Sequence, residues 1–295
     1  MWSSINTASM RHSSRLFAFG ICFLFLAQLC FGQELRTPAT ATAGTSISLA
    51  TAGTGSATLY LVGPSSALKK TVQLGEDVTL PAESVRSAGR YLAVLCSGSC
   101  ESASFFVTAA APAELSFLVH PSRVPVDRQN AISGAAFIFD KFGNLVFSPL
   151  TVNFQLLSGK SEITSREVPA HDGIAWFRAN SGKQTGPVRV VASTGGHSTD
   201  QVVAQVASDP CNLRIDAQST AKNIVVQTQP VRDCSGNPVP DGTIVTFTRR
   251  GPDGLSTVDA PIKKGIARAE MTPSGPAVVT AASGVVMGNE IHVGH

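Results

Sequence analysis

The chain repeats one short pattern, and this repeat limits the folds that it can adopt. Asp-x-x-Gly-Asn-x-Val occurs as DKFGNLV at 140–146 and again as DCSGNPV at 233–239. Each copy is followed by a glycine-led segment, GIAWFRA from Gly173 or GIARAEM from Gly265, and then by GPVRVVASTGG or GPAVVTAASG. The three successive offsets are 93, 92 and 89 residues. Such small drifts are typical of tandem copies of one domain, and a period of about 90 residues suits a small β-sandwich.

The repeated pattern has the composition of a turn. Its Asp can accept hydrogen bonds from the backbone amides that follow, its Gly permits a positive φ, and its Asn tolerates the left-handed region. The Val-x-Phe segment after each copy alternates as a half-buried strand does. We therefore predict a structural strand connector in both places and not a ligand site. Its residues are Asp140, Gly143, Asn144, Asp233, Gly236 and Asn237.

The remaining sequence indicates an all-β protein. Short alternating runs rich in Val, Thr, Ile and Phe recur between Gly, Pro, Asn and Ser clusters, and no stretch shows a sustained helical period. Strands are expected at 151–157, 188–193, 223–229 and 243–249. The segment SAGRYLAVLC places Tyr91 where an Ig-like sandwich has a tyrosine corner, with the hydroxyl bonded to the backbone.

On these residues, the segment from 113 to 295 resembles the bacterial Ig-like domains of the invasin and intimin type. The resemblance implies an Ig-like sandwich that serves as a spacer or adhesion module at the cell envelope. Nothing in the chain resembles the outer-membrane barrel or the lectin-like tip of the best-known members, so host-cell binding is not implied. The matching residues are Asp140, Gly143, Asn144, Val146, Val152, Phe154, Gly173 and Ala175 in one copy, and Asp233, Gly236, Asn237, Val239, Val245, Phe247, Gly265 and Ala267 in the other.

The chain begins with the features of a secretory signal peptide. Arg11 and Arg15 precede the apolar run LFAFGICFLFLAQL, and the small-residue rule places the cleavage after Gly32. A lipoprotein site at Cys30 and an uncleaved membrane anchor are the alternatives. Pro-containing segments then divide the mature chain. The predicted organisation is a signal peptide at 1–32, followed by three tandem immunoglobulin-like β-sandwich domains at 33–112, 113–208 and 209–295.

Four cysteines remain once the predicted leader is removed, and export would expose them to an oxidising compartment. Three pairings are possible, of which the order along the chain favours Cys96 with Cys100 and Cys211 with Cys234. A zinc site is the competing interpretation, but zinc sites usually have a second close pair of ligands, which these segments lack. We predict two disulfides and no metal or cofactor site.

Charge and motifs argue against two classes of function. Lys and Arg number 23 and Asp and Glu 20, and isolated basic doublets do not form a stripe that follows phosphates, so no nucleic-acid partner is expected. GGHSTD brings His197, Ser198 and Asp200 together, but neighbours on a strand point to opposite faces and cannot form a catalytic triad. We predict no catalytic residues and therefore expect that the protein is not an enzyme. We also expect no membrane span in the mature chain.

Trp176, the one tryptophan beyond the predicted leader, is the residue most open to a binding role. In GIAWFRA it shares a face with Arg178, opposite Ala175 and Phe177. An outward tryptophan can stack on a sugar ring or anchor a protein, whereas packing under a loop or domain joint is the simpler explanation. We expect a non-catalytic protein exported to the periplasm, the cell surface or the medium. Its partner would be an envelope protein or, alternatively, a polysaccharide bound at the face around Trp176 and Arg178.

Overall fold

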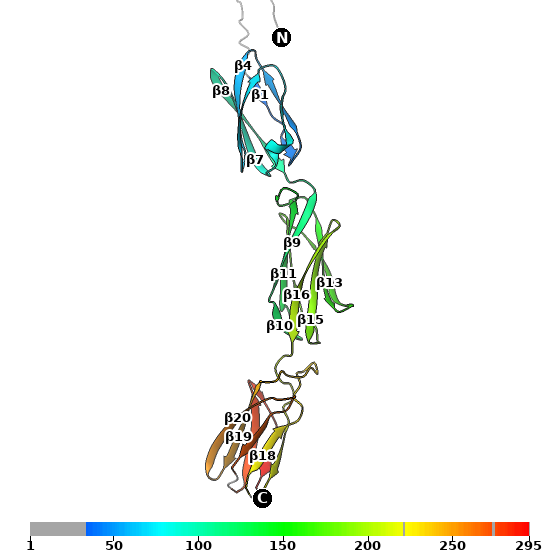
Figure 1. The fold of residues 1–295 in the computed structure, drawn as a ribbon, viewed down its shortest axis with the longest axis vertical. Helices are drawn as coiled ribbons and strands as arrows, with labels where there is room; N and C mark the ends of the chain where they lie inside the picture. The colour runs from blue at the N-terminus through cyan, green and yellow to red at the C-terminus, as the bar shows by residue number, and fades with distance from the viewer. Residues whose placement is uncertain (1–33, 221, 273–274, 295) are drawn as a thin grey trace, which may run out of the picture.

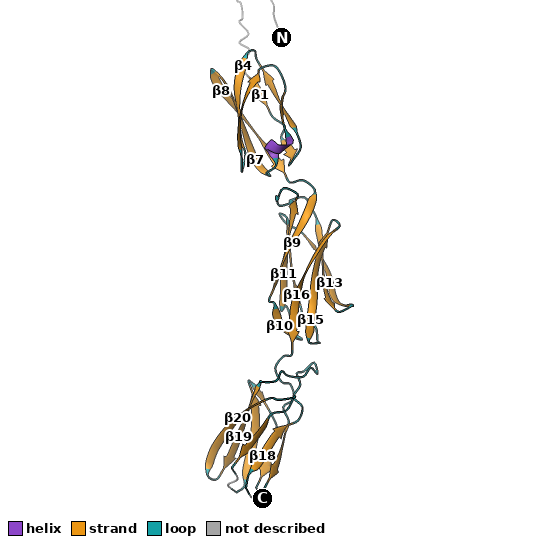
Figure 2. Cartoon of the chain, viewed as in Figure 1, coloured by secondary structure: helices purple, strands orange, loops and turns teal. Residues whose placement is uncertain are grey.

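The computed structural model describes residues 34–220, 222–272 and 275–294. The predicted signal peptide lies outside these residues. Strands make up nearly all of the regular structure, and one short 3-10 helix, η1, interrupts them (Figure 2). The strands form three bodies, each around its own hydrophobic core, and the bodies follow one another end to end as a rod (Figure 1). We name them domains 1, 2 and 3 in chain order.

Domain 1 is a two-layer sandwich. Its sheets have the orders β1-β3-β6 and β2-β8-β7-β4-β5. Alternate side chains of the strands, such as Leu49, Leu59 and Leu95, point inward and are fully buried between the layers. Its elements are β1 Glu34–Arg36, β2 Thr40–Thr42, β3 Ile47–Ala52, β4 Ser56–Val62, β5 Ala67–Gln73, β6 Val78–Leu80, η1 Ala82–Val85, β7 Gly89–Ser97 and β8 Ser99–Thr108.

Tyr91 of domain 1 is buried in the core, where a tyrosine corner would place it. Its ring stacks on Phe105 with the ring centroids 5.4 Å apart. Burial raises the pKa of its hydroxyl. The backbone and hydroxyl of Ser87 and the hydroxyl of Ser66 lower this pKa in opposition to burial, and the Ser87 hydroxyl also pairs with that of Ser65. Tyr91 therefore contributes to this core through packing.

Domain 2 repeats the sandwich with longer strands. Its sheets have the orders β14-β11-β9 and β10-β16-β15-β12-β13, so β14 and β13 are edge strands. Phe117, Phe154 and Phe177 cluster between the layers, and the rings of Phe154 and Phe177 stack with centroids 4.4 Å apart. Its elements are β9 Pro112–His120, β10 Arg123–Pro125, β11 Ile132–Asp140, β12 Thr151–Ser158, β13 Ser161–Pro169, β14 Ile174–Ala179, β15 Gly186–Thr194 and β16 His197–Val206.

Domain 3 has the same two layers. One sheet has the order β17-β18-β21, and the other has the order β20-β19-β22-β23 with β24 also paired to β22. Phe247 and Val245 on β19 are fully buried, as Phe154 and Val152 are on β12. Its elements are β17 Ile215–Ser219, β18 Ile224–Thr228, β19 Ile244–Gly251, β20 Gly254–Pro261, β21 Arg268–Met271, β22 Ala277–Ser283, β23 Val286–Met287 and β24 Ile291–Val293.

The four strands expected from alternation are present as β12, β15, β18 and β19, with small differences at their ends. Asn223 and Thr243 were expected to begin strands but lie in turns. The amide of Thr220 donates to the carbonyl of Asn223, and the hydroxyl of Thr243 donates to the carbonyl of Pro240. Within the three described ranges, no helix is long and apolar enough to cross a bilayer.

Candidate functional site: the domain joints and the exposed edge of domain 2

The repeated turn of domain 2 lies at the joint with domain 1. Asp140 ends β11 and is 1% exposed. Its carboxylate accepts hydrogen bonds from the amides of Phe142 at 2.8 Å and Asn144 at 2.9 Å, which makes the Asx turn that the sequence predicted. It also accepts one from the amide of Ala110, in the linker, at 2.8 Å. Gly143 has a φ of 81°, where a side chain would be strained. Asp140 therefore ties the turn to the linker that leads in from domain 1.

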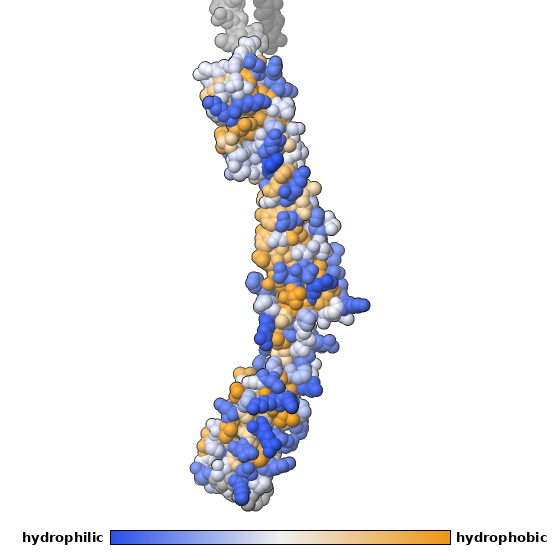
Figure 3. Space-filling model, viewed as in Figure 1, coloured by the Kyte–Doolittle hydropathy of each residue, from blue (hydrophilic) through white to orange (hydrophobic). Residues whose placement is uncertain are grey.

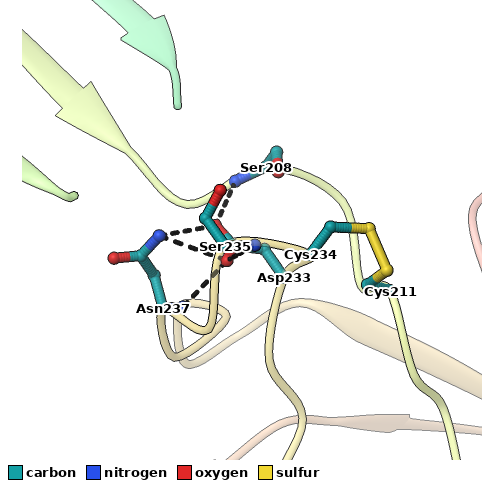
Figure 4. The surroundings of a disulfide bond; sticks show 6 residues. All are labelled: Ser208, Cys211, Asp233, Cys234, Ser235 and Asn237. Atoms are coloured by element: carbon teal, nitrogen blue, oxygen red, sulfur yellow. Dashed lines mark hydrogen bonds between the residues drawn. A yellow bond between two sulfur atoms is a disulfide. The ribbon is translucent and has the colours of Figure 1, made fainter. Parts of the chain in front are cut away.

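The second copy of the turn makes the same contacts at the joint between domains 2 and 3 (Figure 4). Asp233, which is 4% exposed, accepts hydrogen bonds from the amides of Ser235 at 2.9 Å and Asn237 at 2.8 Å. It accepts a third from the linker amide of Ser208 at 3.1 Å. Gly236 has a φ of 86°. The repeated sequence pattern thus forms, in both places, the hydrogen bonds that connect a domain to the linker before it.

The Asn of each turn reaches across the joint. Nδ2 of Asn144 donates to the carbonyl of Arg86 at 2.8 Å, and its Oδ1 accepts from the amide of Ala88 at 2.8 Å, so one side chain pairs with the backbone of domain 1 as a β-strand would. Neither Asn144 nor Asn237 adopts the left-handed conformation that an Asn tolerates. Their role is side-chain bonding across the joint, because the adjacent Gly already supplies the positive φ.

Asn237 makes the same clasp at the next joint. Its Nδ2 donates to the carbonyl of Lys183 at 2.8 Å, and its Oδ1 accepts from the amide of Thr185 at 3.2 Å. In both joints the clasped loop immediately precedes a glycine that begins a strand, Gly89 in domain 1 and Gly186 in domain 2. We call this pair of hydrogen bonds the Asn clasp. The turn pattern did not predict it, because the clasped carbonyls lie 58 and 54 residues earlier in the chain.

The two carboxylates owe their ionisation to these contacts. Burial raises the pKa of Asp140 and of Asp233, but the hydrogen bonds from the Asn of the turn, the turn amides and the linker amide outweigh burial. The pKa of each carboxyl therefore lies below the ordinary value of an aspartate. Both groups are charged near neutral pH, which strengthens the bonds that they accept.

The two joints are reinforced in different ways. In the first, Phe142 packs against the core of domain 1, over Gly44, where a Cβ atom would collide with the ring. In the second, the equivalent of Phe142 is Ser235, and Cys234 forms a disulfide with Cys211 in the linker, with Cα atoms 4.7 Å apart (Figure 4). An apolar insertion in one turn and a covalent bond in the other thus stand at neighbouring positions of the repeated pattern.

Both predicted disulfides are confirmed. Cys96 and Cys100 are direct partners in the ladder between β7 and β8, and Gly98 turns the chain between them with a φ of 81°. The bond closes this hairpin at the end of domain 1 remote from the joint. The bond between Cys211 and Cys234 instead fixes the linker of domain 3 beside its repeated turn.

Trp176 and Arg178 lie on the outer face of edge strand β14. Trp176 is 65% exposed, so it is not packed beneath a loop or a joint. The ladder register sets Trp176 beside Ala135 of β11 and Leu118 of β9, and Leu118 is 55% exposed. Figure 3 shows apolar residues gathered over β9 and β11 on the visible side of domain 2. This face has the aromatic and apolar character of a contact surface.

The GGHSTD segment forms the tip of the hairpin between β15 and β16. Gly195 and Gly196 turn the chain, with φ values of 54° and 83°, and His197 pairs with Thr194 at the start of β16. Across the described part of the chain, no group of three or more His, Cys, Asp or Glu side chains is placed to hold a metal ion.

The comparisons with known proteins point to one fold. No protein-family model and no curated protein sequence matches the chain. The Escherichia coli adhesin FdeC aligns over 90% of this chain and 98% of its own, with a TM-score of 0.63 at 16% identity. InvD of Yersinia pseudotuberculosis aligns over 88% of this chain and 96% of its own, with a TM-score of 0.50 at 13% identity. The all-β fold is therefore confirmed, and the resemblance is confirmed as one of fold: the chain has a tandem Ig-like architecture that FdeC and InvD share.

Proposed function

We propose that the chain is an exported, non-catalytic rod of Ig-like domains that acts as an adhesion, interaction or spacer module at the cell envelope. The main support is the agreement between the two joints. A spacer needs adjacent domains held in a defined orientation, and both joints place a buried Asp and a bridging Asn where they do this. The adhesins that share the fold support a role at the envelope.

In this proposal residues 1–32 are removed as a signal peptide, and the domains comprise residues 33–112, 113–208 and 209–295. The mature protein would function in the periplasm, at the cell surface or in the medium, with a protein or polysaccharide of the envelope as its partner. Short linkers at 109–111 and 207–214, each bonded to the turn that follows it, support a rod of limited flexibility.

Small-angle X-ray scattering of the mature chain tests this function. A rod held by its joints should give a maximum dimension equal to three domains end to end, unchanged by salt. A second sample, mixed with envelope fractions from the native host, should sediment with one of them. A compact or broadly distributed shape would contradict the spacer role, and sedimentation with none of the fractions would contradict the envelope role.

The exposure of Trp176 favours a second candidate function, the binding of a polysaccharide at the outer face of β14. Aromatic side chains supply a flat apolar surface on which a sugar ring can lie. Because Trp176 is the one tryptophan of the mature chain, its fluorescence reports on this face directly. Emission should be red-shifted in the free protein and should shift to the blue with a polysaccharide fraction. Emission indifferent to every fraction would exclude this candidate.

A further inference from the structure

Domain 2 has a cleft along the side where its two sheets end. The edge strands β13 and β14 flank it. Two cavities, of about 740 Å³ and about 450 Å³, meet there and share the residues Ile163 and Asn180. Phe154 and Phe177 of the core contribute to the lining of the smaller cavity. The sandwich is therefore open on this side, and the opening is long enough for an extended ligand.

Cations outnumber anions in this cleft. Arg166 and Arg178 line the smaller cavity, Arg128 and Lys183 line the larger one, and Asp127 is the one carboxylate in the lining. Arg128 pairs with a carboxylate of the following linker at 3.3 Å. Among the residues that the structure describes, the other three cations make no ion pair. The remaining polar lining consists of Ser, Thr, Asn and Gln side chains, which can donate and accept hydrogen bonds.

The matching edge of domain 3 has an apolar residue where domain 2 has a cation. Arg166 lies directly opposite Phe154 in the ladder between β12 and β13, so it projects from the core side of its strand. In domain 3 the residue opposite Phe247 is Val258, which packs against the core. Because a guanidinium without a partner is too costly to bury, Arg166 stays open to water, whereas Val258 packs against its core.

The outer face of the same edge also differs between the two domains. By ladder register Arg178 corresponds to Glu270, and Trp176 corresponds to Arg268. Domain 3 thus has the same fold, but with the opposite charge at the position of Arg178 and with no indole at the position of Trp176. Neither Arg178 nor Trp176 is needed for an Ig-like edge, and a binding role would explain both.

The loop that forms one wall of the cleft is held from two sides. Gln205, which is 3% exposed, accepts a hydrogen bond from the amide of Gly182 and donates one to the carbonyl of Gln184 at 2.9 Å. From the other side, Asn237 of domain 3 binds the carbonyl of Lys183 at 2.8 Å. The wall is therefore ordered before any ligand arrives, which reduces the entropic cost of binding. It is also connected to the second domain joint.

We infer that this cleft binds an acidic polysaccharide whose sugar units carry carboxylates, and that Trp176 stacks on a sugar ring beyond its end. The inference rests on the proposed polysaccharide role and names its ligand class. Guanidinium groups bind carboxylates in a bidentate manner, and the amide and hydroxyl lining suits sugar hydroxyls. Trp176 and Arg178 lie on one face of β14, about 7 Å apart along the strand, so neighbouring sugar units would reach both. An acidic peptide would use the cations but not the indole platform.

Isothermal titration of the mature protein against three acidic oligosaccharides, from polygalacturonate, alginate and hyaluronate, tests the inference. At least one should bind, more weakly as salt is added, and should shift the emission of Trp176 to the blue. A neutral maltooligosaccharide, oligoglutamate and single-stranded DNA serve as controls and should not bind. No binding of the three acidic sugars, or equal binding of any control, would overturn the inference.

Variants locate the site. The double variant R166A/R178A should weaken binding by about tenfold or more, and W176A should weaken it by about threefold to tenfold. R268A, at the matching edge of domain 3, should bind as the wild type does. N237A should weaken binding because it frees the wall of the cleft, whereas N144A, the same change at the other joint, should not. Losses of equal size in R268A and R166A/R178A would place the ligand elsewhere and contradict the proposal.

Scattering data on the same samples separate this inference from the proposed rod function. R166A/R178A should keep the wild-type maximum dimension, which shows that the variant is folded. If no acidic sugar binds while the wild-type rod has its full length, the cleft inference fails and the spacer function stands. If the wild-type protein is not a rod, the spacer function fails whatever the titration shows.

Discussion

Domains 2 and 3 are alike where each meets the domain before it and unlike along one edge, which β13 and β14 form in domain 2 and β20 and β21 form in domain 3. At the joints the same Asp binds the linker and the same Asn clasps the preceding loop, although the two residues between the Asp and the Gly are Lys and Phe in one copy and Cys and Ser in the other. Along the edge, Arg166 stands where domain 3 has Val258. The difference separates two kinds of position: the repeated residues build the rod, and the unrepeated ones are free to differ in what they bind.

Among the changes that test this comparison, removal of the buried Asp should cause the largest loss of stability. D140A and D233A each leave several backbone amides without an acceptor, so we expect each to lower the free energy of unfolding of its own domain by about 2–4 kcal/mol. Hydrogen exchange resolved by domain would measure both losses. D77A, at an exposed position of domain 1, is the control. A loss in either variant no larger than that of D77A would contradict a joint built on the Asp.

Removal of each disulfide by substitution should distinguish a bond that fixes a domain joint from one that closes a hairpin. The bond between Cys211 and Cys234 spans a sequence separation of 23 residues and the other spans 4. On chain-entropy grounds C211S/C234S should cost about 3 kcal/mol and C96S/C100S about 2 kcal/mol. The first variant should also loosen the orientation of domain 3, and the second should leave all domain orientations unchanged. Chemical denaturation measures the loss of stability, and scattering measures the domain orientation. A larger loss of stability in C96S/C100S than in C211S/C234S would contradict these expectations.

The substitution F142S gives the first joint the residue that the second joint has at that position. Because Phe142 packs on the core of domain 1 from outside it, the variant should lower the stability of domain 1 by about 1–3 kcal/mol. Hydrogen exchange in β3 and β6 would report the loss. F147S, at a phenylalanine that is 67% exposed, is the matched control and should have no effect. Equal effects of the two substitutions would show that the insertion does not stabilise the joint.

Acid should weaken both joints together. The folded-state pKa of Asp140 and Asp233 lies below the ordinary aspartate value, so their contribution is fully present above that ordinary value, about 4, and is lost as the pH falls through the folded-state pKa. The scattering profile should therefore be constant from neutral pH to about pH 5 and should broaden well below pH 4. The variant D140N/D233N should not show this transition. A wild-type profile that is unchanged at low pH would argue that the carboxylates do not hold the joints.

The sequence was sufficient for the local part of this architecture. An Asx turn and a cross-hairpin disulfide depend on residues close together in the chain, so both could be predicted. The Asn clasp could not, because the bonded carbonyls lie 58 and 54 residues before the Asn and the turn pattern does not identify them. At the edge of domain 2, alternation selected Trp176 and Arg178 but missed Arg166. The face of β13 from which Arg166 projects depends on the pairing register of β12 with β13, and this register shifts at an irregularity after Leu156.

The most direct test of the rod is the distance distribution between neighbouring domains. Nitroxide labels on cysteines introduced at Thr71 and Ser165 would span the first joint, and labels at Ser165 and Thr257 would span the second. Pulsed EPR should give narrow distributions for both pairs in the wild type. N144A should broaden the first pair alone, and N237A the second pair alone. Broad distributions in the wild type, or narrow ones in both variants, would contradict the claim that the Asn clasp sets the orientation of consecutive domains.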